Sequence, residues 1–300
     1  MPKDLVSVVT ITRNRGPLLK RCLTSVLNQT YTEIESIVVD GASTDNTDEV
    51  ISSFNDQRLK YIKLNKNLPI VETLNIAIKN CSGKFISFLD SDDEYVLSKI
   101  EKQVSLINTL PEDYGMVYCW MRYIDSKTKK TIRIHKPKLR GFVGNDVVAK
   151  PLVSGTPSYF FRAYALRSSG GWKSNIGIIS DWELAARFCQ VWKVDFVSEP
   201  LVKVFVNHDL NQMTSISYYE NMHEKLIIFH NYFLIEFSKV FLNYPNRMEY
   251  HLLRLVFSYT FLGMYKKAWS CYYRLLTINL NFKNIFYPFS AIIKKYNLCK

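Results

Sequence analysis

Three aspartates stand close together directly after a short apolar run. The segment "FISFLDSDDEY" places Asp90, Asp92 and Asp93 within four positions, with Ser91 among them. Carboxylates at this spacing repel one another, and burying them beside apolar side chains is unfavourable unless a cation or hydrogen-bond donors compensate. Hard divalent cations prefer oxygen ligands, and Mg²⁺ or Mn²⁺ held by one or two carboxylates suits a diphosphate. The cluster therefore predicts a site for a divalent cation and the phosphates of a nucleotide.

The first hundred residues alternate between strand-like and helix-like segments, and this alternation must position the cluster. Runs rich in β-branched residues predict strands, and segments with apolar residues at helical spacing predict the helices between them. The strands are expected at 5–12, 34–40, 59–65 and 84–90, and the helices at 16–30, 43–55 and 68–81. Right-handed crossovers then give a parallel sheet with helices on both faces.

Ligands of an open parallel sheet bind beyond the carboxyl ends of its strands. The segment "TRNRG" follows the first strand, Asp40 ends the second, and the aspartate cluster follows the fourth. We therefore expect all three at one edge of the sheet. The sequence contains no G-x-G-x-x-G after the first strand and no G-x-x-x-x-G-K-[ST], which argues against dehydrogenases and P-loop enzymes. The nucleotide is instead expected to be held by carboxylates and a metal.

Three segments in this order resemble the inverting family 2 glycosyltransferases of the GT-A fold. They are "VSVVTITRNRGPLLKRCLTSVLNQTY", "IVVDGASTDNT" and "FISFLDSDDEY", and the similarity extends over residues 5–209. The resemblance implies an α/β fold with a Rossmann-like, mostly parallel sheet, helices on both faces and a C-terminal helical extension. It also implies an enzyme that uses a nucleotide-sugar, most readily a UDP-sugar, together with Mn²⁺ or Mg²⁺.

The resemblance assigns roles to individual residues of the nucleotide site. It implies that Asp40 contacts the nucleobase and that Thr12 and Arg13 frame the nucleoside. The DxD element of the family falls on Asp90, Ser91 and Asp92, which would hold the metal on the donor diphosphate, and Asp93 extends it. One departure is visible, because the family often has a paired aspartate where this chain reads Asp40-Gly41-Ala42-Ser43. Asp45 matches a family aspartate, although capping of the following helix explains it as well.

A second informative region follows in the middle of the chain. "SGTPSYFFRAYALRSSGGWKSNIGIISDWELAARF" resembles the acceptor half of the family, in which a helix opens with an aspartate, here Asp181. The resemblance implies that Asp181 is the base that deprotonates the acceptor hydroxyl. A helix N-cap is the structural alternative for Asp181, and Glu183 is a competing base. His208 in "VFVNHDLNQMTS" matches a late histidine that approaches the metal or the diphosphate, although a lone histidine is more often structural.

Composition limits the remaining possibilities. The 300 residues are 47% hydrophobic and carry a formal net charge of +12, which favours anionic partners. Six separated cysteines without a C-x-x-C pair indicate neither a zinc site nor a disulfide framework, and the N-terminus does not fit a secretory signal. We therefore expect a cytoplasmic protein. No uninterrupted apolar run of spanning length occurs, so a spanning helix is not expected.

The domain prediction places a glycosyltransferase domain at residues 1–210, with a nucleotide-sugar half at 1–110 and an acceptor half at 111–210. Residues 211–300 are predicted to form a basic, aromatic-rich helical extension, with a helical hairpin that turns at Gly263. These helices either buttress the catalytic domain or dock on an anionic membrane surface, which would make the protein peripheral on the inner face of the cell membrane.

The resemblance as a whole implies an inverting hexosyl- or N-acetylhexosaminyl-transferase. Its acceptor would be a glycan or a polyprenyl-diphosphate-linked sugar, in the synthesis of surface polysaccharide, O-antigen or capsule. Two alternatives stay open. A sugar nucleotidyltransferase would need a glycine-rich phosphate loop after the first strand, where "TRNRGPLLK" supplies only Gly16. A non-catalytic basic protein that binds membrane or nucleic acid would leave the carboxylates unexplained, so no nucleic acid partner is expected.

Overall fold

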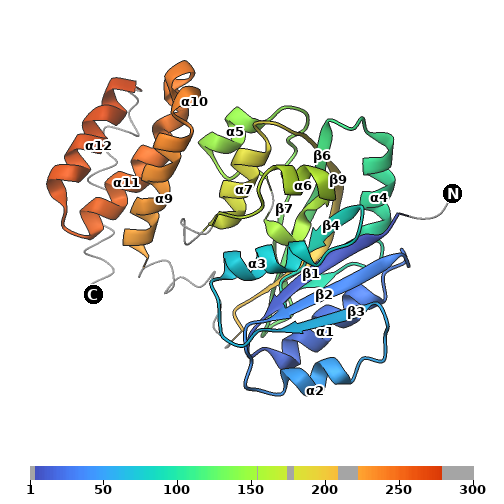
Figure 1. The fold of residues 1–300 in the computed structure, drawn as a ribbon. Coiled ribbons are helices and arrows are strands. Elements are labelled where there is room, and N and C mark those ends of the chain that lie inside the picture. Colours follow the sequence, from blue (N-terminus) through green and yellow to red (C-terminus); the bar gives the residue numbers. More distant parts are fainter. Residues whose placement is uncertain (1–3, 154, 174–178, 209–221, 279–300) are drawn as a thin grey trace. The chain divides into compact units, whose positions relative to one another are not determined.

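The computed structural model describes residues 4–153, 155–173, 179–208 and 222–278 (Figure 1). These residues form two compact units. The first unit contains the described residues up to 144, those between 152 and 173 and those between 181 and 208. The second contains residues 145–151, 179–180 and 222–278.

The first half of the first unit is built from the predicted alternation of strands and helices. Its four strands pair in the order β3-β2-β1-β4, and all of these pairs are parallel. The strands are β1 (Val6–Thr12), β2 (Ile34–Asp40), β3 (Leu59–Lys63) and β4 (Phe85–Phe88), and the helices between them are α1 (Gly16–Leu27), α2 (Thr47–Ser52) and α3 (Ile70–Lys79). The predicted α/β fold is therefore confirmed, with element ends that differ by a few residues.

The second half of this unit continues the same sheet with strands in both directions. Its strands are β5 (Glu94–Tyr95), β6 (Tyr114–Asp125), β7 (Thr131–His135), β8 (Phe160–Arg162) and β9 (Lys193–Val206). Strand β8 is antiparallel to both β4 and β6, whereas β6 and β9 run parallel. The sheet is thus parallel in its first four strands and mixed beyond them. The helices of this half are α4 (Lys99–Thr109), α6 (Ala163–Ser168) and α7 (Ser180–Phe188), with a short 3-10 helix at Thr156–Ser158.

The two-residue strand β5 determines what lies next to the aspartate cluster. It follows the cluster directly and pairs antiparallel with β9, so that Glu94 faces Lys203 and Tyr95 faces Val202. Because β9 ends at Val206, this pairing brings the residues after β9 beside the aspartates. The late histidine predicted from the sequence lies on that segment.

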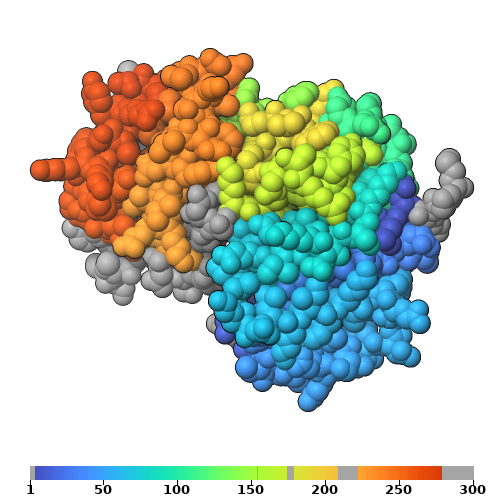
Figure 2. Space-filling view, in the orientation of Figure 1, coloured from blue at the N-terminus to red at the C-terminus, as the bar shows by residue number. Residues whose placement is uncertain are grey.

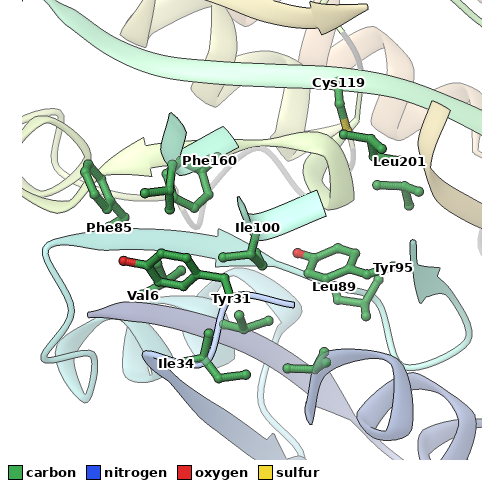
Figure 3. Close-up of a cluster of buried hydrophobic side chains, with 14 of the residues drawn as sticks. Val6, Tyr31, Ile34, Phe85, Leu89, Tyr95, Ile100, Cys119, Phe160 and Leu201 are labelled. Atoms are coloured by element: carbon green, nitrogen blue, oxygen red, sulfur yellow. The ribbon is translucent and has the colours of Figure 1, made fainter. Parts of the chain in front are cut away.

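A cluster of buried apolar side chains fixes the strand that leads into the aspartates. Figure 3 shows Phe85 and Leu89, from the two ends of the β4 run, packed among residues from β1, α4 and β8. Phe85 and Leu89 are almost completely buried, and full burial of such a side chain contributes about 1.5–3 kcal/mol to stability. The chain therefore leaves the core at a fixed point, directly before Asp90.

The second unit is helical. It contains α5 (Gly144–Ala149), most of whose residues belong to this unit, α9 (His223–Glu236), α10 (Ser238–Asn243), the 3-10 helix Pro245–Met248, α11 (Glu249–Phe261) and α12 (Tyr265–Ile278). Helix α11 packs against both α9 and α12. On the face seen in Figure 2 the orange and red atoms of these helices form one continuous surface. Gly263 lies between α11 and α12 with a φ of +75°, a conformation that glycine adopts readily. This is the hairpin predicted from the sequence.

None of the helices described in either unit combines the length and the apolar composition that crossing a membrane requires.

Candidate active site

The carboxyl ends of β1 and β2 form one side of the site. Thr12 and Asp40 are register partners on these strands. Asp40 is fully buried, and its carboxylate accepts hydrogen bonds from Ser43 N (3.0 Å), Ser43 Oγ (2.5 Å) and Tyr61 Oη (2.7 Å). Thr12 Oγ1 is buried and has no hydrogen-bond partner among the described residues, whereas Arg13 is exposed. Asp40 thus anchors the loop after β2, and its predicted contact with the nucleobase stays a prediction.

The loop after β1 is tied to the loop after β2. Asn14 N donates to Ser43 Oγ (2.8 Å), and Gly16 N donates to Asp45 Oδ2 (3.0 Å). The other oxygen of Asp45 accepts a hydrogen bond from Thr47 N (3.1 Å) in the first turn of α2. Burial alone would raise the pKa of Asp45, but these hydrogen bonds lower it. Asp45 is therefore occupied as a structural link and cap, in agreement with the structural alternative considered for it.

Asp92 lies at the centre of the polar contacts. Its Oδ2 atom is 3.0 Å from Arg15 Nη1 and 2.9 Å from His208 Nε2. Arg21 donates a hydrogen bond to the backbone carbonyl oxygen of Asp92, which fixes the turn that presents this carboxylate. Sequence reasoning assigned Arg13 to the nucleoside, which stays a prediction, and did not name Arg15. Nothing in the spacing of "TRNRG" distinguishes the two arginines, since only the turn after β1 determines which of them faces Asp92.

His208 reaches the aspartates because the chain turns sharply after β9. Asn207 adopts a φ of +61°, and its side-chain amide donates to Asp125 Oδ2 (2.6 Å). The His208 side chain is only 9% exposed. Its Nδ1 atom is buried and has no hydrogen-bond partner among the described residues. The structure therefore places His208 beside Asp92, and its predicted role as a metal ligand stays a prediction.

The other residues of the cluster differ in their surroundings. Asp93 is 3% exposed, and its Oδ1 accepts a hydrogen bond from Phe205 N of β9 (3.0 Å). Burial, followed by the charges of Asp92 and Asp90, raises the pKa of Asp93. The Oγ atom of Ser91 is buried without a hydrogen-bond partner in the described part of the chain. Asp93 thus faces the backbone of β9, which leaves Asp90 and Asp92 as the carboxylates available to a ligand.

Asp90 links the cluster to the acceptor half. It is accessible to water, yet protein surrounds it closely enough for burial to be the main cause that raises its pKa to about 7. The charges of Asp92 and Asp181 raise this pKa further, and Arg15 opposes them. Asp92 and Asp181 therefore both lie within electrostatic reach of Asp90, although 91 positions separate Asp90 from Asp181 in the sequence.

Asp181 lies in the first turn of α7, as the sequence predicted. Its Oδ1 accepts a hydrogen bond from Trp182 N (2.8 Å), and its Oδ2 is 3.5 Å from the position that a side chain at Gly155 would occupy. Burial raises the pKa of Asp181, against the hydrogen bond from Trp182. A partly desolvated carboxylate in a polar site is a candidate proton acceptor.

The competing carboxylate, Glu183, is already occupied. It is fully buried and forms two hydrogen bonds with the guanidinium of Arg187 (2.8 and 2.9 Å). Arg187 also donates to the carbonyl oxygen of Gly171 (2.7 Å). Glu183 therefore stabilises α7 and the turn at Gly171, and Asp181 is the better candidate for the base.

The residues present fit a divalent cation, although with fewer protein ligands than the sequence indicated. The described residues include no group of three or more histidine, cysteine, aspartate or glutamate side chains arranged for a metal. Asp92 Oδ2 and His208 Nε2 are adjacent, and a mixed oxygen and nitrogen pair suits Mn²⁺. One or two protein ligands are common where phosphate oxygens and water complete the coordination. Asp92 and His208 are thus the residues that would hold the cation, while the roles predicted for Asp90 and Asp93 stay predictions.

Comparison with known proteins gives a consistent assignment. Residues 7–168 match the family described as Glycosyl transferase family 2. An uncharacterized glycosyltransferase of Rickettsia typhi is 30% identical over 230 residues, which cover 72% of this chain and 68% of that protein. The UDP-Glc:alpha-D-GlcNAc-diphosphoundecaprenol beta-1,3-glucosyltransferase WfaP of Escherichia coli is 37% identical over 106 residues. That alignment covers 35% of this chain and less than half, 42%, of the Escherichia coli enzyme.

Solved structures share the fold at low sequence identity. The structure of S. aureus TarS has a TM-score of 0.65 and 16% identity, and the match covers 97% of this chain and 54% of TarS. The mannosyltransferase PcManGT from Pyrobaculum calidifontis, solved with GDP-Man and Mn²⁺, has a TM-score of 0.60 and 15% identity over 99% of this chain and 88% of its own. Together with the family match over more than half of the chain, these similarities establish that the protein belongs to glycosyl transferase family 2 and has the GT-A type of α/β fold.

Proposed function

We propose that this glycosyltransferase moves a hexosyl or N-acetylhexosaminyl group from a UDP-sugar to a glycan or polyprenyl-diphosphate-linked acceptor, with inversion at the anomeric carbon. The observation that carries the proposal is the binding of Arg15 and His208 to Asp92, beside an Asp90 whose carboxylate senses the charges of both Asp92 and Asp181. Two relatives support the choice of substrates. WfaP and WfgD of Escherichia coli are both named as UDP-Glc:alpha-D-GlcNAc-diphosphoundecaprenol beta-1,3-glucosyltransferases. TarS was also solved with UDP and with UDP-GlcNAc.

The residues suggest how the reaction proceeds. Thr12, Arg13 and Asp40 hold the nucleoside at the ends of β1 and β2, and Ser91 lies at the diphosphate. A divalent cation bound by Asp92 and His208 would neutralise charge on the departing diphosphate. Asp181 takes the proton from the acceptor hydroxyl while the acceptor oxygen bonds to the anomeric carbon. The bond from that carbon to the diphosphate oxygen breaks on the opposite face, and the nucleoside diphosphate leaves.

The relatives support a biological role. One of them is named as the putative teichuronic acid biosynthesis glycosyltransferase TuaG of Bacillus subtilis, and it is 34% identical over 107 residues. We extend this role to the present chain and assign it to surface polysaccharide biosynthesis. A polyprenyl-linked acceptor would be presented at the inner face of the cell membrane, so we place the protein in the cytoplasm, bound peripherally to that membrane.

Calorimetric titration with UDP and GDP, with and without Mn²⁺, tests the donor and metal assignments. Asp92→Asn should remove most of the metal-dependent affinity for the diphosphate, because an amide is a weaker ligand than a carboxylate for a hard cation. Asp93→Asn is the matched control, since an amide oxygen can still accept the hydrogen bond from Phe205 N. Equal affinity of the unmodified protein with Mn²⁺ and with chelator would contradict the metal role.

The anomeric configuration of the product tests inversion. Incubation with UDP-glucose or UDP-GlcNAc and a soluble analogue of a lipid-diphosphate acceptor should give a β-linked product, which the anomeric coupling constant identifies by NMR. An α-linked product would contradict direct displacement with Asp181 as the base. Turnover with GDP-sugars alone would reassign the nucleotide and leave the rest of the proposal in place.

A further inference from the structure

Helix α12 presents a row of aromatic side chains to solvent. Tyr265, Trp269 and Tyr273 are spaced four residues apart, which places them along one face of a helix. They are 53%, 63% and 71% exposed, although large aromatic side chains usually contribute to a core. We call these three residues the aromatic face of α12.

The packing of the second unit covers this face only in part, for example where the edge of the Trp269 ring meets Tyr272, with ring centres 5.4 Å apart. Helix α12 binds α11 through another set of side chains, of which Ala268, Tyr272 and Leu275 are buried. Helix α11 contacts both α9 and α12, and Figure 1 shows α12, in red, beside it. The aromatic face therefore remains exposed after α12 has packed, and a contiguous exposed apolar surface marks a site of interaction.

The charge of the C-terminal sequence indicates which partner fits. Lys266 follows Tyr265 on α12 and is exposed, whereas Lys267 turns towards α11, with its Nζ 5.8 Å from the centre of the Tyr259 ring. Helix α12 contains no acidic residue. The sequence after Glu249 contains no aspartate or glutamate at all. The same stretch contains eight basic residues, namely Arg254, Lys266, Lys267, Arg274, Lys283, Lys294, Lys295 and Lys300. The partner should therefore be anionic and offer an apolar layer to aromatic rings.

We propose that the aromatic face of α12 docks on an anionic phospholipid bilayer, with the helix lying in the plane of the interface. Tryptophan and tyrosine favour the boundary between headgroups and acyl chains because their rings are apolar and their polar atoms reach water. Neighbouring lysines are attracted to anionic headgroups. A helix with both features binds a bilayer surface without crossing it. The inference deepens the proposed function, since it assigns a surface to the membrane partner, but the docking itself does not depend on glycosyl transfer.

Trp269 provides a direct probe of docking. The other tryptophans, Trp120, Trp172, Trp182 and Trp192, are buried or half-buried. Vesicles of phosphatidylcholine with a third of phosphatidylglycerol should shift the emission of the full chain to shorter wavelength, and brominated acyl chains should quench it. Both effects should disappear in Trp269→Phe. A shift that persists in Trp269→Phe, or no shift in the unmodified protein, would overturn the proposal.

Vesicle co-sedimentation tests the contribution of charge. A lysine near an anionic surface adds about 1 kcal/mol, or roughly fivefold in affinity, so Lys266→Gln should weaken binding by roughly fivefold at low salt. Lys129→Gln is the matched control, because this lysine is exposed in the turn between β6 and β7. Equal loss of vesicle binding in both variants would contradict docking through the aromatic face of α12. Binding that does not depend on the anionic lipid would also contradict it.

Tyr265→Ser with Tyr273→Ser tests the remaining side chains of the face. This variant should lose vesicle binding and keep both its melting temperature and its sedimentation coefficient without vesicles. A change in sedimentation coefficient with unchanged vesicle binding would show that a second copy of the chain covers the face, which would overturn the proposal. Donor binding measured without vesicles separates membrane docking from the proposed glycosyl transfer. The affinity for UDP should be the same in this variant and in the unmodified protein.

Discussion

Asp92 is bound by two basic side chains, Arg15 and His208, which differ in whether they can share its carboxylate with a metal ion. Arg15 carries a permanent charge and has no lone pair to offer a metal, whereas a neutral His208 can supply a nitrogen ligand. Both contact the same oxygen, Asp92 Oδ2. Arg15 therefore competes with a cation for this oxygen, and His208 can share it. Arg15 would be released when a cation binds Asp92 and could then interact with the diphosphate.

Replacing Arg15 should accordingly have opposite effects on two ligands. Arg15→Met removes a positive charge from Asp92, so the affinity for Mn²⁺ without nucleotide should rise by about three- to tenfold, a free-energy change of about 1 kcal/mol for a charge near the surface. The affinity for UDP in the presence of Mn²⁺ should fall, because a donor to the phosphates is lost. Calorimetry with each ligand measures both, and Arg15→Lys should retain most of the original values. If Arg15→Met changed the affinities for Mn²⁺ and for UDP equally and in the same direction, Arg15 would not exchange between Asp92 and the diphosphate.

Asp181 can be separated from its neighbour Glu183 by a pair of isosteric variants. Asp181→Asn should lower turnover by about two to four orders of magnitude, the usual effect of losing a positioned base. Its melting temperature should hardly change, because an asparagine oxygen can still accept a hydrogen bond from Trp182 N. Donor affinity should be retained, because Asp181 is assigned to the acceptor.

Glu183→Gln should behave in the opposite way. It leaves the half-buried Arg187 without its carboxylate. Breaking a fully buried ion pair costs about 3–5 kcal/mol of stability, and this pair should approach the lower end because Arg187 is 16% exposed. Its melting temperature should fall while the folded protein keeps its turnover. Unchanged turnover in Asp181→Asn, with turnover lost in Glu183→Gln at a temperature where it is folded, would reverse the assignment.

At the level of single elements, α4 begins with a lysine inside the core. Lys99 is fully buried, its Nζ donates to Ser87 Oγ (2.8 Å), and the ammonium lies 3.9 Å from the centre of the Tyr95 ring. Burial lowers the pKa of Lys99 to about 7, from a model-peptide value of 10.5. The folded protein therefore binds fewer protons here than the unfolded chain between pH 7 and 10.5, so this residue makes stability rise with pH across that range.

Lys99→Met should stabilise the protein at neutral pH, since it removes a charge that burial disfavours. The gain should be roughly 2–4 kcal/mol at pH 7, less than the full shift in pKa implies because the contacts with Ser87 and Tyr95 are lost. It should shrink towards pH 10. Urea denaturation of both proteins at pH 7, 8.5 and 10 measures this, and Lys102→Met, at an exposed ion pair with Glu199, is the control. A loss of stability at all three pH values would mean that the ammonium is favourable where it lies.

The elements nearest the N-terminus were the ones that the sequence predicted well. Alternating runs and helical spacing predicted β1 to β4 and α1 to α3, because each is decided by local propensity and burial. The predicted strand at 34–40 coincides with β2, Ile34–Asp40. The mixed strand order of β8, β6, β9 and β5 could not be predicted, since the pairing partners are distant in sequence and no local pattern specifies them.

The same limit applies to the candidate site. Family resemblance already pointed to Asp92, Asp181 and His208. The contact of His208 with Asp92, however, spans 116 positions and depends on the pairing of β5 with β9. The contact of Arg15 with Asp92 depends on the turn at Asn14, whose φ is +52°. Such features arise from tertiary structure, so only the structure assigns them.

For the molecule as a whole, the two compact units predict that unfolding is not a single transition. Domains with separate cores can unfold independently, and one stability value then describes neither. The second unit contains a feature of its own, a buried pair of histidines. His230 Nδ1 lies 3.0 Å from His251 Nδ1, and His251 Nε2 lies 2.8 Å from the carbonyl oxygen of Val148. Because that carbonyl can only accept, His251 carries its proton on Nε2 and its Nδ1 accepts a hydrogen bond from His230 Nδ1.

The hydrogen bonds require a neutral His251, and burial disfavours a charge on His230, so the second unit should be sensitive to acid. Burial lowers the pKa of His230 to about 2 and that of His251 to about 4, from 6.5 in the unfolded chain. The unfolded chain therefore binds more protons below pH 6.5, and stability should fall by roughly 3–5 kcal/mol between pH 7 and 4.5. Hydrogen exchange in α9 and α11, corrected for intrinsic rates, should accelerate over this range well before exchange in β1 and β2. His230→Gln with His251→Gln should flatten the response, whereas His135→Gln in β7 should leave it unchanged. The contrary result would be that α9 and α11 lose their protection against hydrogen exchange at the same pH as β1 and β2, in the unmodified protein and in both variants. In that case neither the histidine pair nor the independence of the two units controls acid unfolding.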